Sequence, residues 1–447
     1  MTAILSDLTL ALLKAAHEAG AESADAMAAT GTSVAISLRN GALEQAERSE
    51  GIEIGLRVLI NGRQACVSAS DISRPTLIAL AERAVAMARE APVDPHAGLA
   101  DPDQLARSWD LAALDLTDPA TEPGAADLEQ MARRAEAAAL EAKGITQVET
   151  TAAYGQRTVH LAATNGFSGG YGRTSHSLSA VAFTGQGTDM HRDYAGEYRT
   201  HASDMPVAEA IGQLAAERTL QLIGSVKPRT GSFPVVYDER VAASLIGHLL
   251  SAINGSSIAR GSSWARDLLG KPVLPQDLSL VEDPHRSRTS ASRPFDADGL
   301  PTRHRTIVDG GILTGWVLDL ATARKLGMTS TGNAARGTAA PPSPSTTNID
   351  LTQGTHSRTD LLAQMGTGLL ITSMIGSTIN PTTGDYSRGA SGFWVENGQI
   401  LHPVHECTVA GNLREMLLRL IPANDARPHL STRVPSLLVE GMTIAGA

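Results

Sequence analysis

The sequence has few of the features that mark a secreted or membrane-bound protein. It contains two cysteines, Cys66 and Cys407, which form neither a disulfide framework nor a CxxC motif, and this is typical of a reducing compartment. No segment approaches the roughly 20 apolar residues that span a bilayer. The first apolar run, 8–13, follows Asp7 with no basic residue before it, unlike a secretory signal. We therefore predict a cytoplasmic protein with no membrane partner.

Aromatic residues and positive charge are also scarce. Aromatic side chains make up 3% of the 447 residues, whereas the hydrophobic fraction is 42%, so the core must be built mainly from Ala, Leu, Ile and Val. The formal net charge is −10, and no segment is rich in Lys or Arg. Because contacts with phosphates require a basic face, we expect no direct binding of nucleic acid.

The chain is long enough for two or three domains, and the pattern of predicted elements changes near 227–231. Residues 1–226 interleave helical and strand patterns, which predicts an N-terminal α+β domain. Its helices are expected at 4–19, 75–89, 127–143 and 206–223, and its strands at 33–38, 51–60, 64–69, 146–153, 158–163 and 172–183. Residues 227–447 hold short strand patterns with Gly-rich turns, which predicts a β-rich C-terminal domain with a curled sheet or barrel. The predicted fold class is α+β.

Two parts of the C-terminal half carry stronger local signals. Asn397-Gly398 between apolar runs predicts a tight hairpin, since both residues accept positive φ. Leu369–Ile375 is typical of a buried strand, and the following Ser377–Ser391 is interpreted as a Gly-rich loop.

The stretch 232–264 combines a strand and a helix. Phe233–Tyr237 predicts a buried strand, and Asp238 and Glu239 suit the start of a helix. Apolar residues then recur with the spacing of one helical face. We expect the helix to end at Gly255 and the serines that follow it.

The polar side chains in this half leave several interpretations open. His248 lies on the apolar helix, where a packed histidine and a histidine in a substrate groove or interface are both considered. Gly384–Gly389 is either a loop with a local ion pair between Asp385 and Arg388 or a loop that contacts peptide. The segment 402–407 carries side chains that bind metals, and the alternative is a buried Cys407 beside a histidine at the sheet edge.

Sequence motifs exclude some catalytic classes. The chain has no G-x-S-x-G nucleophile elbow and no G-x-x-x-x-G-K-[ST] phosphate loop. Neither serine-hydrolase chemistry of that type nor nucleotide hydrolysis is therefore supported.

Many stretches, in order along the chain, resemble the TldD/PmbA family. They include 173–177 (RTSHS), 258–264 (IARGSSW), 283–286 (DPHR), 292–296 (SRPFD), 384–394 (GDYSRGASGFW) and 408–412 (TVAGN). The resemblance is strongest from about residue 151 to residue 411, and these stretches are most similar to those of the PmbA (TldE) branch of the family. Proteolytic members of the family carry H-E-x-x-x-H, and the six matching residues here are Ala243-Ser244-Leu245-Ile246-Gly247-His248.

The resemblance implies a subunit that lacks the catalytic zinc site. Ala243 and Ser244 replace the first histidine and the glutamate, and 424–431 has no cysteine where the family has its third ligand. No catalytic or metal-binding residue is therefore assigned to this chain. Zinc is expected in a TldD-like partner of a heterodimer that degrades or processes unfolded peptides, bacteriocin precursors or antitoxins. The resemblance leaves open whether homodimers form in the partner's absence.

Five residues are the candidates for contact with an extended peptide or a partner: His248, Asp385, Tyr386, Ser387 and Arg388. Two other functions are weighed against the subunit. One is a non-enzymatic regulator similar to a modulator of DNA gyrase, as an older name of the family suggests. The other is an independent hydrolase with a nonstandard site at His402, His405 and Cys407.

Overall fold

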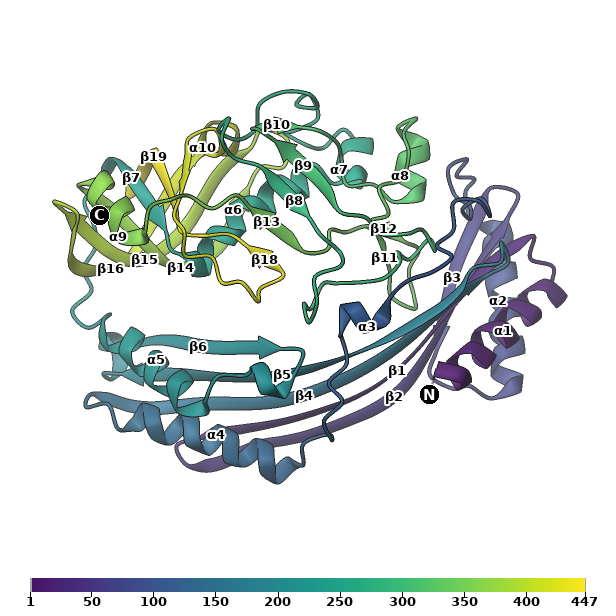
Figure 1. The fold of residues 1–447 in the computed structure, drawn as a ribbon, viewed down its shortest axis with the longest axis horizontal. Helices are drawn as coiled ribbons and strands as arrows, with labels where there is room; N and C mark the ends of the chain where they lie inside the picture. Colours follow the sequence, from purple (N-terminus) through teal and green to yellow (C-terminus); the bar gives the residue numbers. More distant parts are fainter. Residues whose placement is uncertain (1, 447) are drawn as a thin grey trace.

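The computed structural model describes residues 2–446, and a long curved sheet forms its lower layer in Figure 1. The sheet has six antiparallel strands in the order β3-β2-β1-β4-β5-β6. The elements of this part are α1 (Thr2–Glu18), β1 (Ser23–Arg39), β2 (Ala42–Ile60), β3 (Arg63–Ala69), α2 (Arg74–Glu90), α3 (Leu111–Leu114), α4 (Ala125–Leu140), β4 (Ile145–Ala163), β5 (Ser168–Thr184), η1 (Gly187–Asp189), β6 (His191–Arg199), η2 (Ala202–Asp204) and α5 (Ala208–Leu220).

The alternation of side chains gives the sheet two different faces. Even-numbered residues of β1 are buried under helices, α1 and α2 covering one end of that face and α4 and α5 the other. The helices contribute many alanines to these contacts, so the sheet and helices pack closely despite the scarcity of aromatic residues. Odd-numbered residues, such as Gly55 on β2 and Arg173 on β5, contact the C-terminal part instead.

The C-terminal part lies over this second face (Figure 1). Its elements are β7 (Gly231–Tyr237), α6 (Glu239–Ala252), α7 (Gly255–Ala259), β8 (Leu280–Glu282), β9 (Arg305–Asp309), β10 (Ile312–Leu313), α8 (Leu320–Lys325), β11 (Ala334–Ala335), β12 (Ser343–Pro344), β13 (Ile349–Leu351), α9 (Arg358–Met365), β14 (Gly368–Ile379), β15 (Asp385–Glu396), β16 (Gln399–Asn412), α10 (Leu413–Leu417), β17 (Leu420–Pro422), β18 (Thr432–Arg433) and β19 (Leu437–Ala445). No helix within 2–446 is both long enough and apolar enough to cross a membrane.

The larger C-terminal sheet closes on itself. Its order is β16-β15-β14-β7-β19-β17, and β16 also pairs with β19, which completes a barrel-like ring. Helix α6 packs against this ring through fully buried residues such as Leu245 and Leu249. The predicted α+β class and the curled β-rich C-terminal sheet are confirmed.

Three local predictions about strands were wrong. Residues 146–153 and 158–163 belong to one continuous strand, because Gly155 is paired with Ser33 on one side and Ser175 on the other. Ser377–Ser391 is mostly strand: β14 continues to Ile379, and β15 begins at Asp385. Gly389 was taken for part of a loop, although its pairing with Ile375 and Thr408 places it in strand β15.

Two further predictions need correction. The helix that starts at Glu239 does not extend to Gly255 and the serines, because α6 ends at Ala252 and Gly255 opens the separate helix α7. The side chain of Asn254 caps α7 by accepting from the Ser256 N–H. Strand β6 was not predicted, since its charged and tyrosine residues lack a clear apolar alternation.

Gly55 tests the contact between the two parts. A Cβ atom at Gly55 would lie 2.1 Å from the Thr338 carbonyl oxygen. We therefore expect Gly55→Ala to lower the free energy of unfolding by about 1–3 kcal/mol, because the backbone of the C-terminal part must move away. Gly51→Ala on the same strand meets no atom within 4 Å and serves as the control in urea denaturation. Equal stability of the two variants would contradict this packing.

Candidate functional site

Helix α6 carries the six residues that resemble the metal-binding motif. Ala243 packs against the apolar core, and the Ser244 hydroxyl donates to the Val241 carbonyl at 2.6 Å. Leu245 and Ile246 are fully buried. The face that the motif would use in a protease is thus occupied by packing and by a hydrogen bond within the helix.

His248 is held as a neutral imidazole. Its ring stands edge-on to that of Tyr386 with centroids 5.9 Å apart, and Nε2 is buried without a hydrogen-bond partner among the described residues. Burial lowers the pKa of His248 to about 4, and the positive charge of Arg388 contributes to the shift. The ring contact agrees with the interpretation of His248 as a packed residue, and a role in a substrate groove or interface stays a prediction.

The other four candidates are the first four residues of strand β15, and their side chains do not form one cluster. Tyr386 is buried and donates from its hydroxyl to Met374 Sδ at 3.6 Å, while Arg388 Nε donates to the Gly376 carbonyl at 2.8 Å. Asp385 instead accepts from Thr383 Oγ1 at 2.6 Å and from Asn412 Nδ2 at 3.1 Å. The proposed ion pair between Asp385 and Arg388 was therefore wrong. Ser387 alternates with Tyr386, so it points to the opposite face of the strand.

The side chains at the motif do not fit a zinc ion. Ala243 has no donor atom, the Ser244 hydroxyl is bonded to backbone, and His248 alone offers a typical ligand atom. A catalytic zinc needs about three protein ligands and an open position. Within 2–446, no group of three or more His, Cys, Asp or Glu side chains is placed to hold a metal ion.

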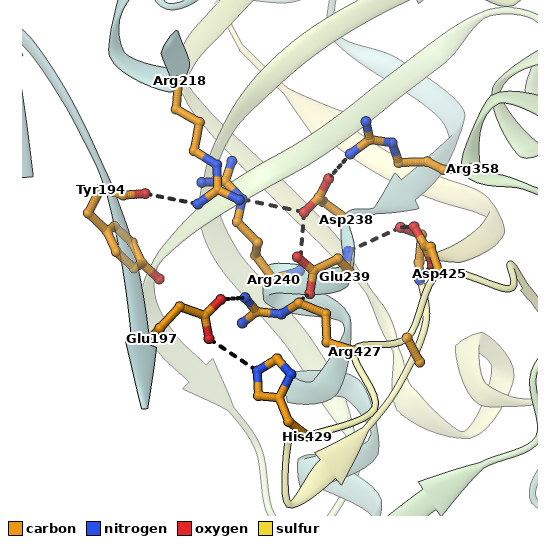
Figure 2. Close-up of polar contacts among 12 residues, drawn as sticks. Tyr194, Glu197, Arg218, Asp238, Glu239, Arg240, Arg358, Asp425, Arg427 and His429 are labelled. Carbon is orange, nitrogen blue, oxygen red and sulfur yellow. Dashed lines mark hydrogen bonds and ion pairs between the residues drawn. The ribbon is translucent and has the colours of Figure 1, made fainter. Parts of the chain in front are cut away.

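The segment 424–431, where the resemblance expected the third ligand, lies against strand β6 (Figure 2). His429 Nε2 lies 3.2 Å from one Glu197 oxygen, and Arg427 Nη1 donates to the other at 3.0 Å. Arg427 Nε also lies 3.3 Å from Glu239 at the start of α6. The segment therefore joins the C-terminal part to the N-terminal sheet.

A second set of ion pairs surrounds the first turn of α6 (Figure 2). Arg240 Nη1 donates to both Asp193 oxygens at 3.1 Å, and its Nε lies 3.4 Å from Asp238. Arg358 pairs with the other Asp238 oxygen at 2.5 Å, and Arg218 donates to the Tyr194 carbonyl at 3.0 Å. These ion pairs were not predicted, because Asp193 lies on β6, a strand without a clear apolar alternation in the sequence.

Two open cavities are notable, the first lined by both parts of the chain and the second by the N-terminal sheet alone. The first, of about 500 Å³, adjoins the ion pairs at the first turn of α6 and is lined by Arg218, Arg358, Phe393 and other side chains. The other, of about 440 Å³, lies on the sheet face that the C-terminal part covers. Its floor consists of small residues of β1, β2 and β4, with charged and aromatic side chains at its sides: Gly31, Gly51, Gly155, Arg157, Arg173 and Tyr198.

His402, His405 and Cys407 are not arranged as a reactive site. His402 Nδ1 lies 3.2 Å from the Pro403 carbonyl oxygen, and the His405 side chain is 38% exposed. Glu406 has a φ of 49°, which breaks the alternation of the strand. Burial raises the pKa of the Cys407 thiol to about 11, so it stays protonated at neutral pH, and it donates to the Ala390 carbonyl. This geometry does not favour the independent hydrolase.

Comparisons with known proteins agree with the architecture. Residues 24–88, 118–223 and 230–446 match profiles described as PmbA/TldA metallopeptidase domain 1, central domain and C-terminal domain. The chain is 38% identical over 420 residues to "Metalloprotease PmbA" of Escherichia coli O157:H7, covering 93% of this chain and 90% of that protein. The chain belongs to the PmbA/TldD metallopeptidase family. The PmbA (TldE) branch suggested by the sequence is confirmed.

Other members of this family extend the comparison. "Metalloprotease PmbA homolog" of Haemophilus influenzae is 35% identical over 439 residues, covering 96% of this chain and 94% of the relative. A crystal structure from Bacteroides thetaiotaomicron, described as a proposed modulator of DNA gyrase, has a TM-score of 0.91 at 27% identity, covering 99% and 98% of the two chains. The structure of TldE from Thermococcus kodakarensis has a TM-score of 0.84 at 17% identity, covering 98% and 100%, and therefore shows a common fold.

The charge state of His248 can be measured directly. With its pKa lowered from 6.5 to about 4, the imidazole should stay neutral at pH 6. Its protonation is disfavoured in the folded state, so this residue lowers the free energy of unfolding as pH falls from about 6.5 to about 4. NMR titration, with His248→Asn to assign the ring signals, should place the midpoint near the lower value. A midpoint near 6.5 would contradict the buried packing.

Arg240 should matter more for stability than Arg358. The side chains of Arg240 and Asp193 are 10% and 8% exposed, so Arg240→Met leaves a buried carboxylate unpaired and should cost about 3–5 kcal/mol. The Arg358 side chain is 47% exposed, and Arg358→Met should cost about 1 kcal/mol or less. Denaturant unfolding of both variants gives the comparison, and similar losses would argue against the buried pair.

Proposed function

We propose that this chain is the non-catalytic PmbA (TldE)-type subunit of a TldD–TldE heterodimeric zinc metalloprotease. The observation that carries the proposal is the set of side chains on α6. In this member of a metallopeptidase family, Ala243 and Ser244 stand where the protease motif has a ligand and a carboxylate. A chain that keeps the fold and lacks the donor atoms is suited to complete a partner's site.

In this proposal the zinc and its activated water belong to the TldD-like partner. A metal-bound water needs a carboxylate to take up its proton, and the Ser244 hydroxyl, bonded to the Val241 carbonyl, is a poor substitute. The neutral, half-buried His248 packs edge-on against the ring of Tyr386. The chain's contribution is therefore a wall of the chamber in which the partner cleaves peptide.

The proposed ligand is an extended or unfolded peptide. Main-chain hydrogen bonds between a peptide and a sheet edge give affinity with little dependence on side chains, which suits processing of varied peptides, including bacteriocin precursors or antitoxins. Of the five candidate residues, Tyr386 is 1% exposed and acts by supporting His248. Contact with peptide or partner is proposed for His248, Asp385, Ser387 and Arg388.

One exposed apolar side chain near Arg388 adds to the case for contact at this hairpin. Arg388 binds the carbonyl of Gly376, and the preceding Ile375 is 77% exposed. A large aliphatic side chain at the surface of a strand is favourable where a peptide or a second chain covers it. The hairpin formed by β14 and β15 is therefore the surface we assign to contact.

Reconstitution with a TldD-like protein tests this function. The mixture should form a 1:1 complex with about one zinc, by native mass spectrometry and metal analysis, and should cleave an unfolded peptide. Loss of the glutamate in the partner's H-E-x-x-x-H should abolish cleavage, whereas His402→Asn in this chain should leave it nearly unchanged, because the proposal assigns no catalytic role to this residue.

Two results would contradict the proposal. One is equal cleavage by the partner with and without this chain. The other is a zinc-loaded homodimer of this chain that cleaves peptide alone. A metal-free homodimer that dissociates when the partner is added is compatible with it.

A further inference from the structure

A buried cluster of charges joins the N-terminal sheet to the C-terminal part at the end away from α5. Asp25 on β1 and Arg57 on β2 come from the sheet, and Arg336 comes from the segment 331–347. Asp296 and Asp298 lie in the loop before β9. These side chains are almost completely removed from solvent.

Asp25 is the best-paired member of this cluster. Arg57 Nε donates to Asp25 Oδ2 at 2.6 Å, and Arg57 Nη2 lies 2.5 Å from the same oxygen. Arg336 Nη1 donates to Asp25 Oδ1. The two guanidinium groups together lower the pKa of Asp25 despite its burial, so this carboxylate is charged.

Asp298 and Asp296 have weaker partners. The Leu320 N–H donates to Asp298 Oδ2 at 3.0 Å, while Arg57 Nη2 lies 4.0 Å from Asp298 Oδ1. Asp296 accepts from the backbone N–H groups of Asp298, Leu300 and Ala334 at 2.9, 2.9 and 3.0 Å. Neither carboxyl group has a hydrogen bond from a guanidinium group among those that the structure describes.

Counting charges shows one acid in excess. Four carboxyl groups and three guanidinium groups face this junction: Asp25, Asp296, Asp298 and Asp319 against Arg57, Arg293 and Arg336. The other titratable groups nearby are Cys66 of β3 and His160 of β4. Burial lowers the pKa of His160, so its imidazole is neutral. An unpaired buried charge is strongly unfavourable, and a proton on one carboxyl group removes the excess.

We propose that Asp298 is a proton-binding site at the junction, protonated when the segment 331–347 is docked on the N-terminal sheet and losing its proton as the solution becomes alkaline. Loss of this proton places a second negative charge beside Asp296 and weakens the docking. This protonation makes the contact between the two parts of the chain sensitive to pH without involving any residue of α6.

The proton affinity of Asp298 supports this assignment. Burial raises the pKa of Asp298 to about 8, the Asp296 carboxylate raises it as well, and Arg57 opposes the shift. Burial likewise raises the pKa of Asp296 to about 6. An unfolded aspartate loses its proton near 3.8, so the contribution of Asp298 to stability is fully present below that pH and is lost as pH rises toward about 8.

Unfolding measured by urea from pH 5 to pH 9 tests the proposal in the full chain. The equilibrium constant for unfolding of the wild type, relative to Asp298→Asn, should rise by up to tenfold per pH unit between about pH 5 and pH 8 and then level off. Asp309→Asn removes an exposed carboxylate in the same half and should keep the wild-type pH dependence. Parallel curves for the wild type and Asp298→Asn would overturn the proposal.

Two further measurements keep the test decisive if Asp298→Asn does not fold. Infrared difference spectra of the wild type should contain the C=O band of a protonated carboxyl group at pH 7 that disappears by pH 9. Asp296→Asn, which removes the neighbouring negative charge, should move this disappearance to lower pH. The absence of the band at pH 7 would refute the assignment. So would a band that disappears in Asp296→Asn at the same pH as in the wild type or at a higher pH.

Discussion

The strict alternation of side chains along six long strands is the constraint on which this structure depends. One face of the sheet is buried under four helices rich in alanine, and the other must accept a complete second part of the chain. Close approach of the backbones at Gly55 and Thr338 is available only without a Cβ atom. Small residues therefore let the two parts meet, and buried ion pairs determine how they meet.

The ion pairs concentrate at two ends of the interface. At one end Arg240 and Arg427 connect α6 and the segment 424–431 to strand β6, and at the other Arg336 enters the N-terminal sheet beside Asp25. The pairs of Arg240 with Asp193 and of Arg336 with Asp25 are buried, and removing one member of such a pair is strongly destabilising. These pairs therefore favour one orientation of the two parts of the chain.

The region that resembles a protease active site has become part of the core. Ala243 packs inward, Ser244 bonds to its own helix, and His248 is neutral against the ring of Tyr386. Each change removes a donor or a charge that catalysis would need and replaces it with packing. The helix thus packs against the C-terminal core while Ala243 and Ser244 supply neither the histidine nor the carboxylate of the protease motif.

The sequence alone determined the long helices of the N-terminal half, the Asn397-Gly398 hairpin, the β-rich C-terminal half and the family, because local periodicity and motif order carry that information. It also identified the missing donors at Ala243 and Ser244. Only the tertiary structure decided that 385–391 is strand, that Asp193 of β6 pairs with Arg240, and that Asp298 has, among the described residues, no guanidinium group nearer than Arg57 at 4.0 Å. Those features depend on residues far apart in the chain, whose pairing and burial no local pattern encodes.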